Sequence, residues 1–479
     1  MHRWPGRSLR SWTCRTVIAA TVVAGSAVAA PPATLARTLT LQPTIAAGDE
    51  EFENVANTLQ PGDTLALRGG TYSQSARRAI TCVGSAAAPI VIMSYPGERA
   101  ILTRPADNID TQNNIEVVGC SYLHLLNLAF QGGSSGMRVI GGDHLTIEGC
   151  EIYETGNNGI AVNSGTYSYD GFVIRGNEIH HTGLSVNGTT EGEGMYLGCN
   201  DNVCRVVNAV VEGNYIHHTR STSQGGNDGI EVKVGSGGNV IRNNVIHDTN
   251  IGTQFPGIFV YGGGTAPNIV EGNAIWNAGE GIQVVSDATV RNNIVFQCVS
   301  TGITAAPHSQ VTTMKNVTIV NNTLYNNPEG IYVRWSGAST MLLANNAVYS
   351  PGATAVNAGG LGGAGIRVAS NYVEGTVSGA SVDNIAFFLG GTASAAFTDP
   401  SFPDFFPKLT SPFRGMATAA YATPLDFNET PRTSPFDVGA YEMESELANP
   451  GWVLKPGFKA GGASADTTPP AATRDLRAP

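Results

Sequence analysis

Short alternating strands recur along the middle of the chain, each introduced by a glycine. In every copy, aliphatic residues alternate with variable ones, and this period of two is typical of a β-strand that buries one face. An amphipathic helix is disfavoured because the segments are short and their period is two. The copies read GIAV at 159, GMYL at 194, GIEV at 229, GIFV at 257, GIQV at 281 and GIYV at 330.

A second motif recurs between these strands: a Gly or Asn, then Asn, any residue and an aliphatic residue. Its asparagines are spaced by about 28 residues per step, which is within the range of a solenoid coil. Strands this short cannot bury a face alone, but coils stacked about 4.8 Å apart bring identical positions into register. The column begins with Cys150 and continues with Asn177, Asn214, Asn244, Asn273, Asn293, Asn322 and Asn346.

The two repeats together predict an all-β fold, a parallel β-helix with an aliphatic interior and ladders of asparagine at its turns. A β-propeller is disfavoured because each blade needs four strands and about 40 to 45 residues. The stretch EEFENVANTL at 50–59 is the one clear helical segment, and we expect it to cap the open end of the apolar core. The asparagine column fades after Tyr349.

The ends of the chain differ from the repeats. Residues 1–29 combine four arginines, an apolar run and the small residues Ala27-Val28-Ala29, which predicts a signal peptide and a secreted (extracellular or periplasmic) protein. A membrane anchor is disfavoured because the run is shorter than the ~20 residues of a spanning helix. We expect the β-helix domain at 37–447. Residues 448–479 are rich in Pro, Gly and Ala, which favours an exposed linker or tail.

Composition narrows the range of partners. Only 14% of the 479 residues are charged and the net charge is −11, which becomes −15 once the four arginines of the signal peptide are removed. Nucleic-acid binding is disfavoured because basic residues do not cluster. No later segment is long enough to insert into a membrane, and the chain is expected to be a monomer.

Six cysteines follow the signal peptide, and export to an oxidising compartment favours disulfides. Cys199 and Cys204 flank the loop CNDNVC, which a bridge would clip, and Cys82 with Cys120 is a second expected pair. Zinc binding by these cysteines is disfavoured by their spacing. A recurrent set of histidines after the asparagine column is attributed to the repeat rather than to a metal-binding stripe; its members are His180, His181, His217, His218 and His247.

Outward positions of consecutive coils are expected to form a shallow groove with chemistry at one place. At that place the segment EGEGMY, which begins at residue 191, is expected to stack on NDGIEVK, which begins at residue 227. Together the two segments bring several carboxylate groups close to one another, and calcium binds such hard oxygen ligands. A solvated ladder of surface charge is the alternative interpretation. The expected calcium ligands are Glu191, Glu193, Asp228 and Glu231.

Lys233 is the candidate base, with Tyr261 and Arg334 as further catalytic candidates. The candidate sugar contacts are Tyr196, Phe259, Gln283 and Tyr332, and aromatic residues in this stripe, including Trp335, are either sugar platforms or ordinary strand residues.

From about Leu41 to Glu442 the chain resembles secreted right-handed parallel β-helix proteins of the polysaccharide lyase and epimerase kind. The opening PGDTLALRGGTY with PIVIMSYPGERAIL resembles the N-terminal coils of the chondroitinase B and alginate lyase group and of the pectate lyase group, and DVGAYE resembles the ending of many such helices. The resemblance implies a single-stranded right-handed β-helix, calcium held by acidic residues, a Lys base and an Arg acid. The stretch GIEVKVGSGGNVIRNN looks like the Glu and Lys coil of that group, but no Arg occupies the outward column on the next coil.

The function expected from these features is a polysaccharide lyase that cleaves an acidic, uronate-containing polysaccharide by calcium-assisted β-elimination. A uronate C5 epimerase shares the proton abstraction and is one alternative. A noncatalytic carbohydrate-binding or surface protein is the other, since many functions occur on one scaffold.

Overall fold

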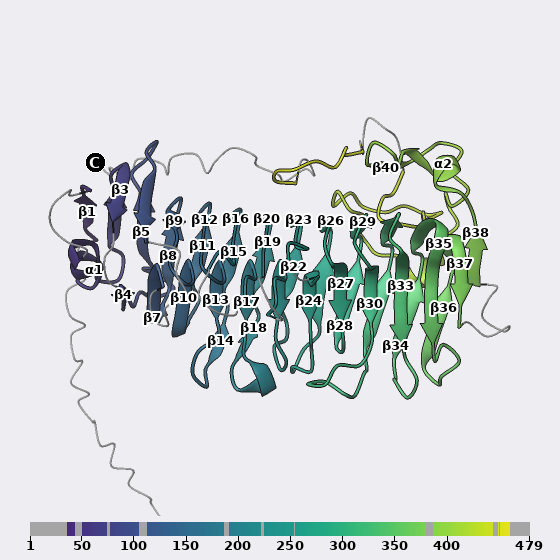
Figure 1. Ribbon diagram of the computed structural model, residues 1–479, viewed down its shortest axis with the longest axis horizontal. Helices are drawn as coiled ribbons and strands as arrows, with labels where there is room; N and C mark the ends of the chain where they lie inside the picture. The colour runs from purple at the N-terminus through teal and green to yellow at the C-terminus, as the bar shows by residue number, and fades with distance from the viewer. Residues whose placement is uncertain are drawn as a thin grey trace, which may run out of the picture. The chain divides into compact units, whose positions relative to one another are not determined.

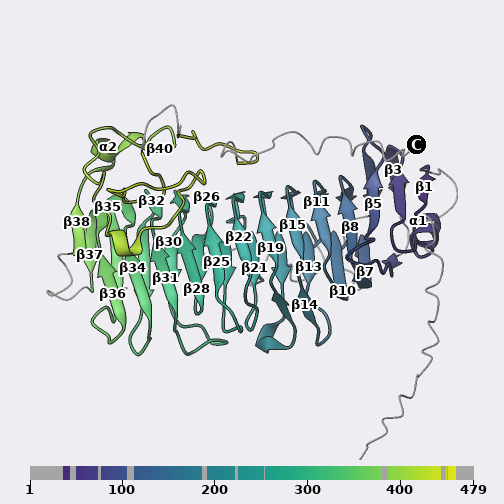
Figure 2. The same ribbon diagram turned by 180° about the vertical axis from the view of Figure 1, so that it is seen from behind.

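Parallel strands stack coil on coil throughout the computed structural model, which describes residues 36–43, 50–73, 77–104, 113–185, 191–221, 225–252, 254–379, 387–443, 449 and 451–459. The predicted signal peptide 1–29 lies outside these residues. Each coil contributes one strand to each of three faces, and every pairing along the faces is parallel. The expected parallel β-helix is therefore confirmed (Figures 1 and 2).

Face 1 is a 13-stranded sheet that runs the length of the β-helix. Its strands are β1 (Thr38–Leu41), β2 (Thr64–Leu67), β5 (Ile90–Ser94), β8 (Leu123–Leu126), β11 (Thr146–Glu148), β15 (Val173–Arg175), β19 (Val210–Glu212), β22 (Val240–Arg242), β25 (Asn268–Glu271), β28 (Ala288–Arg291), β31 (Val317–Val320), β34 (Met341–Ala344) and β36 (Ile366–Ala369).

Face 2 follows the asparagine turn of each coil. Its strands are β3 (Gly70–Ser73), β6 (Ala100–Thr103), β9 (Ala129–Gln131), β12 (Glu151–Tyr153), β16 (Glu178–His180), β20 (Tyr215–His217), β23 (Val245–His247), β26 (Ala274–Trp276), β29 (Ile294–Phe296), β32 (Thr323–Tyr325), β35 (Ala347–Gly359), β37 (Asn371–Ser378) and β38 (Phe388–Gly390).

Face 3 carries the glycine-led strands and shares the long β35 and β37 with face 2, so the two faces form one 23-stranded sheet. Its other strands are β4 (Ala79–Ile80), β7 (Ile115–Ser121), β10 (Met137–Asp143), β13 (Ile160–Val162), β17 (Met195–Leu197), β21 (Ile230–Val232), β24 (Pro256–Val260), β27 (Glu280–Val284), β30 (Thr301–Ala305) and β33 (Glu329–Arg334).

The remaining elements lie outside these faces. A parallel pair, β14 (Ser168–Asp170) and β18 (Arg205–Val207), extends two neighbouring coils, and β39 (Phe397–Asp399) pairs antiparallel with β40 (Asp404–Pro407). Helix α1 (Glu50–Ala56) lies at the N-terminal end (Figure 1) and buries Phe52 and Ala56 in the main core, as the capping prediction requires. Helix α2 (Ala393–Ala396) and the 3-10 helices at Asn200–Asn202 and Ala419–Tyr421 are short. In the described part of the chain no helix is long and apolar enough to cross a membrane.

The asparagine column forms a continuous buried ladder between faces 1 and 2. The Oδ1 atom of Asn273 accepts the backbone N–H and the Nδ2 of Asn244, while its own Nδ2 donates to Ile241 O and to Asn293 Oδ1, at 2.9 to 3.0 Å. Each amide thus satisfies buried backbone groups of the neighbouring coil, beside the backbone bonds that already join the turns. The ladder continues to Asn371, so the predicted fading after Tyr349 is wrong.

The residue before each ladder asparagine adopts the left-handed conformation, with φ of 60° at Gly213 and 57° at Asn243. Gly and Asn are the residues that tolerate this region best. The Gly/Asn-Asn dipeptide therefore combines a turn residue with a ladder residue, and it recurs from Gly176-Asn177 to Asn345-Asn346.

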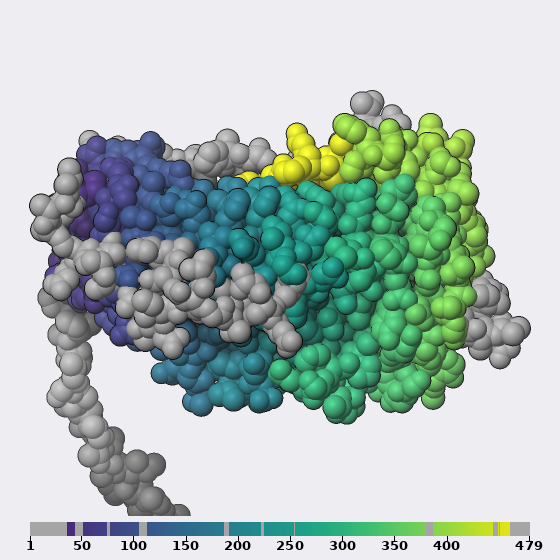
Figure 3. All heavy atoms as spheres, in the orientation of Figure 1, coloured from purple at the N-terminus to yellow at the C-terminus, as the bar shows by residue number. Residues whose placement is uncertain are grey.

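A second apolar core lies on the outer surface of face 2. Phe397, Phe405 and Phe413 of the C-terminal region pack there against Phe296 and Tyr349 of the coils. Residues 451–459 belong to the same layer, and the yellow C-terminal residues lie directly on the coils in Figure 3. Trp452 and Leu454 are buried, so the exposed-linker prediction is wrong for this part of 448–479. The regular coils also end at β38, before the expected boundary at 447.

The cysteine predictions are half right. Cys199 and Cys204 form a disulfide. Cys82 and Cys120 lie beside each other in the core, and Cys82 N–H points at Cys120 Sγ at 3.1 Å, but both thiols are free. The expected second disulfide is therefore wrong. The two residues lie close together because β4 pairs with β7. Both are buried, as are the other free cysteines.

Replacing Asn273 by Ala should destabilise the protein by about 3 kcal/mol or more, because it leaves several buried donors and acceptors unsatisfied at about 1–3 kcal/mol each. Asn250→Ala, which removes one bond to Asn277 in a more exposed turn, is the control and should cost under about 1 kcal/mol. Urea unfolding followed by circular dichroism measures both. Equal destabilisation by the two variants would contradict the ladder's role.

The N-terminal coil is held by a buried carboxylate. Asp63 accepts the backbone N–H groups of Arg37 and Gln60 and pairs with the Arg37 guanidinium. The guanidinium is the main cause that lowers the pKa of Asp63 from 3.8 to about 2.

A carboxylate with a depressed pKa in the folded state stabilises that state above its unfolded pKa, and this contribution is lost as the pH falls. Asp63→Asn should therefore cost about 1–2 kcal/mol at pH 7, a figure reduced because Arg37 is partly solvated. The difference from the unchanged protein should shrink as the pH falls from about 4 to about 2. Urea unfolding across this range, with exposed Asp143→Asn as control, measures it; a pH-independent difference would contradict the assignment.

Candidate functional site

The strand register of face 3 aligns the predicted outward column. Glu231 pairs with Tyr196 on one side and with Phe259 on the other, and each later member pairs with the next. The sequence therefore predicted the correct neighbours across six coils. The aligned residues are Tyr196, Glu231, Phe259, Gln283, Thr304 and Tyr332.

Lys233 lies at the centre of the candidate site, directly after β21. Its Nζ donates to Glu231 Oε1 at 2.7 Å and to Tyr261 Oη at 3.2 Å, and the Tyr261 hydroxyl donates to the same Glu231 oxygen at 3.1 Å. The Lys233 and Glu231 side chains are only 5% and 6% exposed. Burial, and next the charge of Glu231, raise the pKa of Tyr261, so its phenol stays protonated.

Three carboxylates converge beside this lysine. Glu193, Asp228 and Glu231 each offer an oxygen, and these oxygens lie within 4.8 Å of one another. Burial raises the pKa of all three above the ordinary range, and mutual repulsion adds to the rise for Glu193 and Asp228. A buried group of like charges is costly unless a cation or protons neutralise it.

The carboxylate group fits a calcium ion. Oxygens on opposite sides of calcium lie up to about 5 Å apart, because each bond is 2.3–2.6 Å long. Asp228 Oδ1 is buried and has no hydrogen-bond partner in the described structure, although Asn158 Nδ2 donates to Glu193. An unpartnered buried carboxylate oxygen is expected where a cation binds. The possible ligand set is thus Glu193, Asp228 and Glu231, all hard oxygen donors.

Aromatic rings enclose Lys233. Its Nζ lies 4.9 Å from the centre of the Tyr196 ring and 4.5 Å from that of Tyr261, within cation–π range. Phe259 stacks on Tyr261 at 4.0 Å, and the His308 ring meets Tyr261 edge-on at 4.8 Å. Burial, and then the charge of Lys233, lower the pKa of His308, so its imidazole is neutral at pH 7.

Two loops from distant coils meet next to these rings. The Gln310 amide bonds Asn200 Oδ1 at 3.2 Å and the Asp201 N–H at 3.1 Å, and the Tyr196 hydroxyl reaches the same Asn200 oxygen at 3.3 Å. The Cys199–Cys204 disulfide fixes the first loop. The cluster around Lys233 is itself buried, so the expectation of a shallow open groove is wrong at this position.

Other predicted site residues lie away from Lys233. Glu191 is exposed and is outside the three-carboxylate group. Arg334 lies four coil steps along face 3, about 19 Å at 4.7–4.9 Å per step. It stacks on Tyr332 at 3.9 Å and donates to Asn357 Oδ1 at 3.1 Å. Arg334 therefore cannot act on the same bond as Lys233. Trp335 is fully buried in the core and cannot be a sugar platform.

Sequence reasoning missed His308 and Asn158. His308 comes from an irregular loop whose path the repeat does not specify, so the sequence carried no signal that it reaches Tyr261. Asn158 precedes the glycine of its coil as Glu193 and Asp228 precede theirs, and this alignment was a signal that it would contact Glu193.

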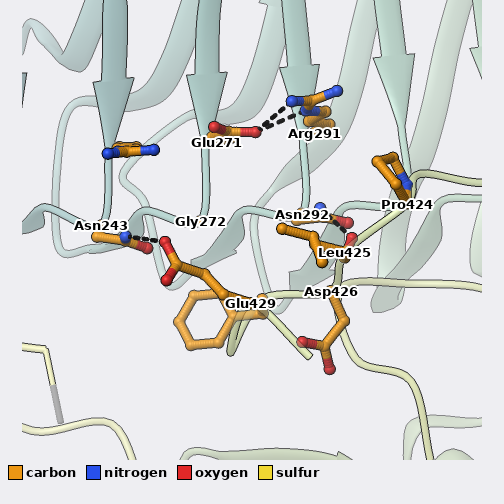
Figure 4. Close-up of a pocket in the computed structure, with 11 residues that line it drawn as sticks. Asn243, Glu271, Gly272, Arg291, Asn292, Pro424, Leu425, Asp426 and Glu429 are labelled. Carbon is orange, nitrogen blue, oxygen red and sulfur yellow. Dashed lines mark hydrogen bonds and ion pairs between the residues drawn. The ribbon is translucent and has the colours of Figure 1, made fainter. Parts of the chain in front are cut away.

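A separate pocket lies between face 1 turns and the C-terminal layer (Figure 4). Arg291 pairs with Glu271 there, and Glu429 accepts from Asn243 at 2.7 Å. None of the sequence-predicted site residues lines it, so this pocket is distinct from the Lys233 cluster.

Comparisons with known proteins agree with this architecture. Residues 37–333 match the protein family described as "Pel9A-like, right handed beta helix region". The pectate lyase Pel9A is 16% identical, with 85% of this chain and 96% of that chain covered and a TM-score of 0.52. This similarity shows the right-handed β-helix fold.

Further solved structures have lower TM-scores. An alginate lyase from Paenibacillus sp. str. FPU-7 is 20% identical, covering 67% of this chain and 99% of that chain, with a TM-score of 0.48. The A-module of a mannuronan C-5 epimerase from Azotobacter vinelandii is 14% identical, covering 67% and 93%, with a TM-score of 0.42. No match was found among curated protein sequences.

Calcium should bind the carboxylate group, and Asp228→Asn should weaken that binding about tenfold or more because calcium affinity follows the number of charged ligands. Isothermal titration with calcium measures it. Glu280→Gln, which changes a carboxylate two coils from Glu231 on the same face, is the matched control and should leave the affinity unchanged. Equal loss in both variants would place the calcium elsewhere.

Proposed function

This chain belongs to the Pel9A-like right-handed β-helix family, and we propose that it is a secreted polysaccharide lyase that cleaves a uronate-containing polysaccharide by calcium-assisted β-elimination. The observation that supports this most directly is the contact of Lys233 with Tyr261 beside three buried carboxylates. The known lyases among its structural neighbours act on pectate and alginate, which are acidic polymers of the expected kind. The basic and apolar residues at 1–29 support secretion.

The elimination needs a base, an acid and neutralisation of the uronate carboxylate. The proton at C5 is weakly acidic because its removal places further negative charge next to that carboxylate. Calcium held by Glu193, Asp228 and Glu231 would supply positive charge that stabilises the developing enolate. These are the three carboxylates whose oxygens fit a calcium ion, and Glu191 is a carboxylate at the periphery of this group.

Lys233 and Tyr261 supply the proton transfers. The Lys233 amine takes the C5 proton, the C5–H electrons form the C4=C5 double bond, and the C4–O4 bond breaks. The Tyr261 hydroxyl gives its proton to the leaving O4. The resulting ammonium and phenolate are hydrogen-bonded neighbours at 3.2 Å, so the proton returns from Lys233 to Tyr261 and the site is reset.

The rest of face 3 would contact neighbouring sugars. Tyr196 and Phe259 lie next to Lys233 but are buried, so they would line the site rather than form an open sugar-binding platform. Gln283 and Tyr332 follow in the same strand register, and Arg334 is stacked on Tyr332 with its positive charge partly exposed. We propose that Arg334 binds a uronate carboxylate of a distant sugar rather than acting as the catalytic acid.

Lys233→Ala should reduce lyase activity by about 10²–10⁴-fold, the usual contribution of a general base. The assay follows ultraviolet absorbance of unsaturated uronate ends during incubation with alginate, pectate and glycosaminoglycans, with calcium or with a chelator. The unchanged protein should be active on one class and should lose activity with the chelator. Lys455→Ala, at an exposed lysine of the C-terminal layer, is the control and should retain full activity.

Each other outcome identifies a different function. Full activity of Lys233→Ala would exclude its role as base. A change in uronate composition without unsaturated ends would identify a C5 epimerase, and binding of a polymer without any product would identify a noncatalytic carbohydrate-binding protein.

A further inference from the structure

A stack of aromatic rings runs along the outside of face 2. The His217 ring lies 4.9 Å from His180 and 5.3 Å from His247, with nearly parallel planes, and Trp276 continues the stack 4.7 Å beyond His247. The rings follow the strand register of β16, β20, β23 and β26. The repeat therefore places three imidazoles in one line, far apart in sequence but in contact in space.

A second line of side chains lies beside the first, at the left-handed residue that follows each strand. His181, His218 and Asp248 occupy it, with φ of 52°, 55° and 55°. His218 stacks on His181 at 4.8 Å, and on the next coil Asp248 replaces histidine. Glu151 and Glu178 contact the Nε2 atoms of His180 and His217 at 3.3 Å, whereas Asp248 lies in the second line itself, between two imidazoles.

Three side chains there share a common focus. Asp248 Oδ2 lies 2.8 Å from His247 Nδ1 and 3.7 Å from His218 Nε2. These donor atoms lie within 4.8 Å of one another. Ligand atoms of a tetrahedral zinc ion, each about 2.0–2.1 Å from the metal, are separated by about 3.3 Å. The observed separations bracket that value, so small side-chain rotations suffice to reach it.

Each of the three ligand candidates is also oriented by a partner on its other atom. His247 Nε2 contacts the Tyr215 hydroxyl at 2.9 Å, which leaves Nδ1 as the lone-pair atom when Nε2 carries the proton. His218 Nδ1 contacts His217 Nδ1 at 2.7 Å, and Asn277 Nδ2 donates to Asp248 Oδ1. Outer partners of this kind are what fix the ligands of metal sites.

We propose that His218, His247 and Asp248 form a second metal site, specific for a divalent transition-metal ion such as zinc. Two imidazoles and one carboxylate are the donors that such ions prefer, whereas calcium prefers oxygen alone. Three ligands leave a coordination position for water, and the His218 side chain is 40% exposed. This site lies on face 2 and is independent of the carboxylate group of face 3.

The test uses tag-free protein, stripped of metal and then kept in excess calcium so that the face 3 carboxylates are occupied. Zinc binding is measured by isothermal titration, and cobalt substitution gives a visible spectrum whose intensity reports four-coordinate geometry. The unchanged protein should bind one zinc per chain. His218→Asn and Asp248→Asn should weaken binding by more than about tenfold, since loss of an outer partner alone costs 10–100-fold.

The matched control is His181→Asn, which makes the same change at the equivalent left-handed position one coil earlier, where Asn is tolerated. It should bind zinc like the unchanged protein. Circular dichroism of the metal-free variants confirms that each is folded. The proposal is overturned if the unchanged protein binds no zinc, if His218→Asn and Asp248→Asn bind it undiminished, or if His181→Asn loses as much affinity.

Discussion

The buried asparagine ladder determines the register on which everything else in this protein depends. Each ladder amide bonds the backbone and the ladder asparagine of the neighbouring coil, so a coil cannot shift without leaving buried polar groups unsatisfied. A shift of one residue would also move Glu231 from the outer surface into the aliphatic interior. The position of the candidate site is therefore a consequence of hydrogen bonds formed on the other side of the coil.

Electrostatics then distinguishes one place on face 3 from the rest. Glu193, Asp228 and Glu231 are buried together, and Lys233 supplies one positive charge against three carboxyl groups. Such an arrangement lowers stability unless it is neutralised, and proteins retain costly buried charge mainly where it serves a function. Glu193, Asp228 and Glu231 are each at most 5% exposed, so little solvent remains to reduce this cost.

The repeat made most of the fold predictable, because one physical requirement is repeated at every coil. The asparagine column, the inward aliphatics and the alignment of Tyr196, Glu231 and Phe259 all follow from parallel stacking with a fixed register. What could not be predicted depends on irregular segments. His308 contacts Tyr261 because of the path of an irregular loop. The distance of Arg334 from Lys233 depends on the number of coils between them. The aromatic residues of 397–413 pack against face 2 only in the folded chain. The free thiols of Cys82 and Cys120 show the same limit: adjacency was inferred correctly, and bonding was not.

The second apolar core has a consequence for how the molecule comes apart. A solenoid contacts only its neighbours, and so it loses coils from its ends. At the C-terminal end, Phe397, Phe405 and Phe413 join the last coils to earlier ones such as β29, so these coils cannot leave singly. At the N-terminal end, the first coil is held by α1 and by the pairing of Asp63 with Arg37. We therefore expect coils to fray first from the N-terminal end, and the strands that carry Lys233 lie between that end and the reinforced one.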